Sequence, residues 1–167
     1  MHVLLRPRTF FEGGKSVRSG RCPSRVCITW KPRARHAASN FHRPDDLQIE
    51  VTDATVHVAQ DLCTKLVDEL VGNALKFSPA GTPIRVTASL NEGQYNIAIS
   101  DRGQGMDAGQ IAAIGAYAQF NRNTQEQQGS GLGLVIVKRI VELHGGKFSI
   151  QSAKDVGTTI SATIPAS

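Results

Sequence analysis

The sequence predicts an α+β fold in which one mostly antiparallel sheet is covered by helices on one face. Apolar and polar residues alternate in several short segments, as they do in half-buried strands. Two longer segments instead carry apolar residues at the spacing of a helix. Asn91-Glu92-Gly93 joins two of the alternating segments, which is the pattern of a hairpin. With 167 residues, 40% of them hydrophobic, the chain suits one compact domain.

Regular patterns begin with an alternating segment at 47–51. A second strand is expected at 56–58, followed by a helix over 60–77 that ends at Pro79 and Gly81. The apolar stripe of this helix should consist of Leu62, Cys63, Leu66, Val67, Leu70, Val71, Ala74 and Leu75.

The rest of the chain continues this mixture of strands and helices. Asp107 and Gln110 have the spacing of a helix cap. A polar, glutamine-rich segment suggests a mobile loop before the last helix. The remaining expected elements are a hairpin at 84–99, a short helix at 108–117, the loop at 119–130, a helix at 132–144 and strands at 148–151 and 158–164.

Residues 1–45 show no helical or strand periodicity. They hold 10 Lys and Arg against 2 Asp and Glu, whereas residues 46–167 hold 9 against 12. We therefore expect a basic segment that is disordered or loosely structured, and a domain at 46–167 that folds without it. A solvated tail, a transit-peptide-like leader and a start that is not native to the domain all remain open.

The composition excludes several classes of protein. No apolar run approaches the ~20 residues that span a bilayer, and we expect neither a membrane segment nor export. The odd set of Cys22, Cys27 and Cys63 fits a reducing, cytoplasmic setting. The acidic balance of residues 46–167 argues against a specific nucleic-acid surface.

A first polar motif lies on the helix predicted at 60–77. Glu69, Asn73 and Lys76 are spaced at i, i+4 and i+7 and therefore share one helix face, opposite the apolar stripe. An amide oxygen is a hard ligand for Mg²⁺, the ammonium can offset phosphate charge, and the carboxylate can act as a base. A solvated polar face explains the same pattern.

A second motif, Asp101-x-Gly103-x-Gly105, follows the hairpin. Asp101 has the parity of the buried face of its strand, so its carboxylate needs a partner such as the amino group of adenine. Gly103 and Gly105 would let the backbone approach a ring closely. A simple turn is the alternative.

A third motif, Gly129-Ser130-Gly131-Leu132-Gly133, leads into the last predicted helix. Glycines at a helix start expose backbone N–H groups, and the helix dipole adds to their attraction for phosphate. A flexible loop with a helix cap is the alternative.

In this order and spacing the three motifs resemble the N, G1 and G2 boxes of the catalytic ATP-binding domain of bacterial sensor histidine kinases. That domain belongs to the superfamily of DNA gyrase, heat-shock chaperone ATPases and MutL. Phe120 with Arg122 resembles the F box of the ATP lid. Thr158 resembles the threonine that helps to line the adenine pocket in this family.

The resemblance implies a two-layer α/β sandwich with a mixed sheet that binds ATP and Mg²⁺. Asp101 would bind the adenine amino group, Asn73 would coordinate Mg²⁺, and Lys76 would contact phosphate. Glu69 would be the catalytic base. The nucleotide-binding set would be completed by Gly103, Gly105, Phe120, Gly129, Gly131, Leu132, Gly133 and Thr158.

The resemblance also implies phosphoryl transfer to a histidine on a helical dimerisation domain and, through it, signalling to a response regulator. None of His2, His36, His42 and His57 has the acceptor context, so we expect the acceptor on a separate or missing domain. His57, in a predicted strand, and His144, at a helix end, are interpreted as structural. An anti-sigma-factor-like serine kinase and a nucleotide-responsive module without transfer activity are the alternatives.

Overall fold

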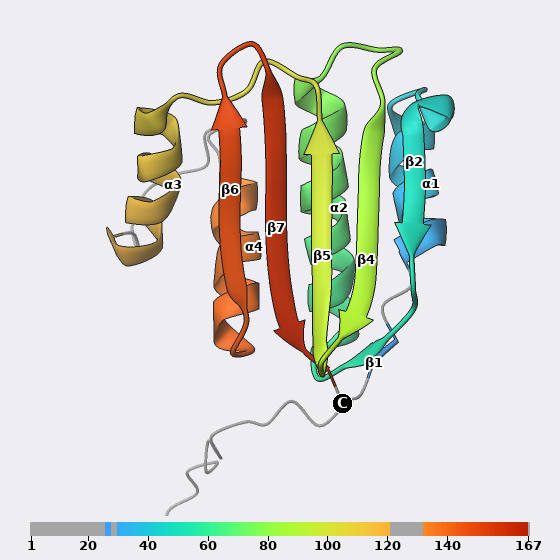
Figure 1. The fold of residues 1–167 in the computed structure, drawn as a ribbon, viewed down its shortest axis with the longest axis vertical. Coiled ribbons are helices and arrows are strands. Elements are labelled where there is room, and N and C mark those ends of the chain that lie inside the picture. The colour runs from blue at the N-terminus through green and yellow to red at the C-terminus, as the bar shows by residue number, and fades with distance from the viewer. Residues whose placement is uncertain (1–25, 28–29, 121–131, 167) are drawn as a thin grey trace, which may run out of the picture.

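The fold is a five-stranded mixed sheet with helices α1, α2 and α4 on one face and α3 beside the β6 edge (Figure 1). The computed structural model describes residues 26–27, 30–120 and 132–166. Strand order is β2-β4-β5-β7-β6, in which β2 and β4 are parallel and all other pairs are antiparallel. The strands of this sheet are β2 (Leu47–Val51), β4 (Ile84–Asn91), β5 (Gln94–Asp101), β6 (Lys147–Ala153) and β7 (Gly157–Pro165).

The helices pack as one layer on the sheet, which confirms the predicted two-layer sandwich. They are α1 (Trp30–Asn40), α2 (Gln60–Phe77), α3 (Ala108–Phe120) and α4 (Leu132–Leu143), with a short 3₁₀ turn, η1 (Pro44–Asp46). Two short strands, β1 (Val26–Cys27) and β3 (Thr55–Val56), pair with each other. In the part of the chain that the structure describes, no helix is long and apolar enough to cross a membrane.

Local sequence signals explain where several elements begin and end. The hairpin turns at Glu92 and Gly93, which have φ of 49° and 72°, the positive values that a two-residue turn of this kind needs. Asp107 and Gln110 form the predicted capping box, with reciprocal N–H to side-chain oxygen bonds of 2.9 Å. Helix α2 ends because Ser78, which precedes Pro79, is extended.

The core lies between α2 and the sheet. The predicted apolar stripe of α2 is buried except for Leu62, which packs only partly against the core. Tyr95, Ile97 and Ile99 alternate on the buried face of β5, as predicted. This packing fixes the C-terminal end of β5 beside the C-terminal half of α2, where two of the predicted motifs lie.

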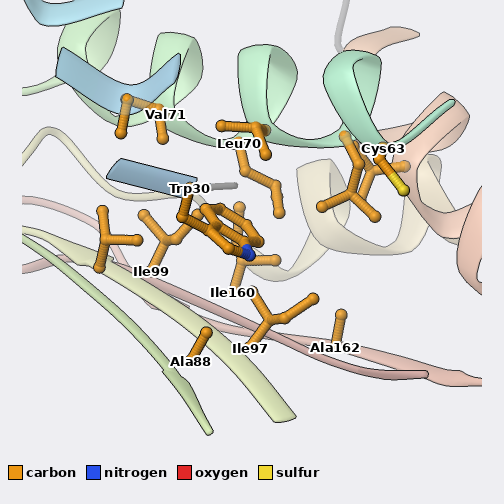
Figure 2. Close-up of a cluster of buried hydrophobic side chains, with 14 of the residues drawn as sticks. Trp30, Cys63, Leu70, Val71, Ala88, Ile97, Ile99, Ile160 and Ala162 are labelled. Atoms are coloured by element: carbon orange, nitrogen blue, oxygen red, sulfur yellow. The ribbon is translucent and has the colours of Figure 1, made fainter. Parts of the chain in front are cut away.

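The expectation that residues 1–45 are loosely structured is wrong for the part that begins at Trp30. This tryptophan is fully buried, and Figure 2 draws it within the same cluster of buried side chains as Leu70 of α2 and Ile97 and Ile160 of the sheet. Ala34 and Ala38, one and two helical turns further along α1, are also fully buried. One large residue followed by alanines gives only a weak periodic pattern of hydrophobicity, which is why the sequence did not predict this helix. The small side chains let α1 pack closely on α2.

Arg43 ties this N-terminal segment to the end of α2. Its Nη1 donates to the carbonyls of Leu75 at 2.6 Å and Ser78 at 2.8 Å, and its Nη2 donates to Pro79 at 2.7 Å. A cation here complements the negative end of the helix dipole. The bond from Arg43 is also the main reason that the pKa of Asp46 lies below its usual range.

The second predicted strand is shorter than expected. β3 ends at Val56, and His57 lies in an exposed bend instead of a strand. His144 does lie just beyond the end of α4, as predicted, and its Nδ1 is 2.7 Å from the carbonyl oxygen of Ile140.

The buried indole predicts a large effect on stability. Trp30→Ala should lower the free energy of unfolding by about 3–5 kcal/mol, the usual cost of removing a buried aromatic side chain. Phe41→Ala is the matched control, because Phe41 lies just after α1 but is 44% exposed; its effect should stay within about 0.5 kcal/mol. Urea unfolding checks both, and equal effects would show that α1 does not belong to the core.

Candidate functional site

A cavity of about 340 Å³ lies between α2, α3, α4 and the strands β5 and β7. Its volume is in the range of small-molecule sites, and such sites combine apolar walls with a few polar groups. The apolar walls include Leu70, Ala74, Ile99, Ile114, Leu134 and Ile160. The polar side chains that line it are Asn73, Asp101, Gln104, Gln110 and Thr158.

Asp101, the last residue of β5, places a half-buried carboxylate in this cavity. Its Oδ1 accepts a hydrogen bond of 2.8 Å from the backbone N–H of Gly103. Burial raises the pKa of Asp101, while the backbone N–H groups of Gly103 and Thr158 oppose that rise. Protonation of Asp101 therefore stabilises the free protein at low pH, and this contribution is lost as pH rises through the raised pKa. An ionised carboxylate here favours a ligand that donates hydrogen bonds.

The two glycines after Asp101 allow close approach between backbone segments, and Gly105 also lines the cavity, where the predicted approach to a ring stays a prediction. A Cβ at Gly103 would overlap the carbonyl oxygen of Phe77, and one at Gly105 would overlap that of Ala153. Gly105 also has φ of +64°, which other residues rarely adopt. The loop after β5 is thereby held between the end of α2 and the end of β6.

Of the three residues predicted to share a face of α2, only Asn73 lines the cavity. Its amide nitrogen is buried and has no hydrogen-bond partner among the residues that the structure describes. Glu69 forms an ion pair with Lys65, with 2.6 Å between Oε1 and Nζ. Lys76 is exposed and lies outside the cavity wall, with its Nζ 5.2 Å from the centroid of the Phe77 ring.

The first turn of α4 lies directly against this face of α2. A Cβ at Gly133 would overlap the Oε2 atom of Glu69 and would lie 3.4 Å from the amide nitrogen of Asn73. The N–H groups at the start of α4 are therefore close to both polar side chains. Leu132, the other predicted residue here, is exposed and does not line the cavity.

Part of the predicted site cannot be placed. Gly129 and Gly131 lie outside the described residues, as does the larger part of the loop predicted at 119–130. Phe120 is the last residue of α3, which is three residues longer than predicted, and its side chain is outside the description.

Several cavity residues were missed by the motif analysis. Phe77 and Met106 lie within the first two predicted motifs, which span 69–78 and 101–106, although neither was assigned a role. Thr158 was found, and it is the register partner of Asp101 across the β5–β7 pair. Gln110 was assigned only as a helix cap, although it also lines the cavity.

The family model for histidine kinase-, DNA gyrase B- and HSP90-like ATPases matches residues 57–167. The chain belongs to this family. The matched segment carries Asn73, Asp101, Gly133 and Thr158, and it is the ATP-binding catalytic module of the kind found in sensor histidine kinases.

Curated relatives of this ATPase domain are sensor kinases. A sensor-like histidine kinase of Rhizobium meliloti is 38% identical over 112 residues, which are 66% of this chain and 21% of the relative. The sensor histidine kinase WalK of Bacillus subtilis is 33% identical over 117 residues, 68% of this chain and 19% of WalK. The chain thus spans about a fifth of the length of these relatives.

Solved structures have the same fold. The mycobacterial sensor histidine kinase MprB superposes with a TM-score of 0.67 at 25% identity, covering 86% of this chain and 98% of that one. The catalytic domain of the histidine kinase ThkA has a TM-score of 0.64 at 18% identity, covering 86% and 96%. The likeness to ThkA supports the fold alone.

The glycine contacts of this ATPase domain predict two different outcomes of mutation. Gly103→Ala should destabilise the fold by about 1–3 kcal/mol, because the added methyl meets a backbone oxygen that cannot move freely. Gly133→Ala should change stability by less than about 1 kcal/mol, because it meets the mobile end of Glu69 and alanine favours a helix. Urea unfolding distinguishes them, and a reversed order would contradict the described loop geometry.

Proposed function

We propose that this chain binds Mg-ATP and transfers the γ-phosphoryl group to a histidine on a helical dimerisation domain, which then passes it to a response regulator in two-component signalling. The observation that carries the proposal is the half-buried Asp101 carboxylate in the cavity, at the register position opposite Thr158. The names of the curated relatives support it. The use of ATP also favours a cytoplasmic site of action.

The cavity accounts for the purine end of the ligand. The Asp101 carboxylate can accept hydrogen bonds from the 6-amino group of adenine, and apolar walls such as Ile99 and Ile160, side by side on the sheet, can pack against the ring. The phosphates would extend toward the first turn of α4 at Gly133, where free N–H groups and the helix dipole favour anions.

The residues near the cavity are suited to a Mg²⁺ ion whose other ligands are phosphate oxygens of the nucleotide. Asn73 lines the cavity, and its amide nitrogen has no partner among the described residues that would stop the side chain from turning its oxygen toward a ligand; Glu69 adds a carboxylate nearby. Both provide the hard oxygen ligands that Mg²⁺ prefers. No cluster of three or more His, Cys, Asp or Glu that could hold a metal is present in the described part of the chain. Asn73 would therefore hold the ion together with phosphate oxygens, and the ion would offset their negative charge.

Glu69 is the candidate base for the transfer. As an imidazole nitrogen bonds to the γ-phosphorus, the bond from that phosphorus to the β-phosphate oxygen breaks and ADP leaves. The proton of the attacking imidazole would move to the Glu69 carboxylate, directly or through water. Lys76 can reach a phosphate only if its exposed side chain turns away from Phe77.

The ion pair between Lys65 and Glu69 favours one alternative, a nucleotide-responsive module without transfer activity. A carboxylate held at 2.6 Å by the Lys65 ammonium is not available to an attacking group unless the pair opens. Retained ATP binding without transfer to any acceptor domain would support this alternative, and acid-stable phosphoserine on a partner would instead support an anti-sigma-factor-like serine kinase.

The proposed transfer is tested with radiolabelled ATP and a helical acceptor domain from a related sensor kinase. The acceptor should gain acid-labile phosphate. Asn73→Ala should abolish the labelling through loss of Mg²⁺, and Glu69→Ala should slow it about 10²- to 10⁴-fold, the usual contribution of a base. Glu50→Ala is the control, because Glu50 is an exposed carboxylate on β2 whose pairing to Arg85 is 3.9 Å long. Normal labelling by Glu69→Ala would remove Glu69 from the mechanism.

A further inference from the structure

The hydroxyl of Ser152 on β6 connects three parts of the cavity rim. It is 2.8 Å from the backbone nitrogen of Met106, 2.9 Å from the carbonyl oxygen of Gly157 and 2.8 Å from the hydroxyl oxygen of Thr158. Met106 and Thr158 both line the cavity, whereas Ser152 itself does not. Ser152 therefore acts on the cavity only through its neighbours.

The number of hydrogens in this group fixes the direction of each bond. A serine hydroxyl has one hydrogen to donate and two lone pairs to accept. The N–H of Met106 can only donate and the carbonyl of Gly157 can only accept, so the hydrogen of Ser152 goes to Gly157. The bond between Ser152 and Thr158 must then run from Thr158 to Ser152.

This direction determines what the cavity offers to a ligand. The hydrogen of the Thr158 hydroxyl is committed to Ser152, and only lone pairs remain on the cavity side. The neighbouring Asp101 carboxylate is also an acceptor, and its own donors are backbone N–H groups of Gly103 and Thr158. Any group that meets Asp101 or Thr158 side chains from the cavity must therefore donate a hydrogen.

We propose that Ser152 is a positioning residue for nucleotide specificity, which orients the Thr158 hydroxyl so that the cavity accepts a 6-amino purine and rejects a 6-oxo purine. The inference rests on the proposed binding of ATP. In adenine the 6-position donates hydrogens, whereas in hypoxanthine it carries an oxygen that can only accept. A 6-oxo group would meet lone pairs in this cavity, and a buried acceptor without a donor is costly.

The same two strands that carry Asp101 and Thr158 offer a matched control. Ser100 on β5 and Thr159 on β7 form a hydroxyl pair of 2.9 Å, one residue along from Asp101 and Thr158. Neither residue lines the cavity. Loss of the Ser100 hydroxyl removes a comparable hydrogen bond from the sheet without releasing Thr158.

The test is equilibrium binding of ATP and of inosine triphosphate, both with Mg²⁺, to the whole chain. Ser152→Ala should free the Thr158 hydroxyl to turn and donate to the 6-oxo group, so the preference for ATP should fall about three- to tenfold, the equivalent of one hydrogen bond. Ser152→Thr keeps a hydroxyl and should retain the preference. Ser100→Ala should retain it as well.

A double-mutant comparison separates positioning from general loosening of the fold. Thr158→Val removes the oriented lone pairs without touching Ser152 and should also lower the preference for ATP. Adding Ser152→Ala to Thr158→Val should then cause no further loss, because the two act through one hydroxyl. Thr158→Val alone keeps the proposal falsifiable if Ser152→Ala folds poorly, because an unchanged preference for ATP in that variant would also overturn it.

The possible outcomes separate the role of Ser152 from the binding of ATP on which it rests. An unchanged preference in Ser152→Ala, or an equal loss in Ser100→Ala, would overturn the role of Ser152 while ATP binding stands. Failure of the parent chain to bind ATP would overturn the proposed function, and the inference with it.

Discussion

The rest of the site depends on how the Asp101 carboxylate is kept half-buried in an apolar cavity. A carboxylate in such a place needs hydrogen-bond donors. The backbone supplies them from two directions: Gly103 in the loop that follows β5, and Thr158 on the paired strand β7. The loop can reach this position only because Gly103 has no Cβ to meet the carbonyl of Phe77. Burial that raises the pKa of Asp101 is a cost to the free domain, and a donating ligand would offset it.

A second constraint brings the phosphate end of the site together. Helices α2 and α4 are in close contact where Gly133 faces Glu69 and Asn73. A side chain at Gly133 would push the two polar groups away from the first turn of α4. The same contact places Glu69 and Asn73, spaced one helical turn apart, beside the first turn of α4, although only Asn73 lines the cavity; Lys76 at the end of α2 remains exposed.

The sequence predicted most of the fold because its signals are local. The hairpin, the capping box of α3 and the apolar stripe of α2 each rest on residues within one element. Helix α1 was missed because its contribution to the core is the long-range packing of Trp30 on other elements. The motifs included Asp101 and Asn73, which the structure places in the cavity. The spacing of residues along a helix, however, predicts only which face of the helix they share. It could not predict that Lys76 turns outward, or that Ser152, on a strand with no recognised motif, holds the hydroxyl of Thr158.

In the proposed complex the Asp101 carboxylate recognises adenine by accepting a hydrogen bond from its amino group. The most direct measurement is a calorimetric titration with Mg-ATP across a range of pH, for the parent chain and for Asp101→Asn. Because burial raises the pKa of Asp101, the affinity of the parent should fall as pH decreases through that raised value, where the carboxyl gains a proton and loses its acceptor character. Asp101→Asn should bind weakly and show little of this dependence. Equal affinity of the variant and the parent at neutral pH would contradict the account.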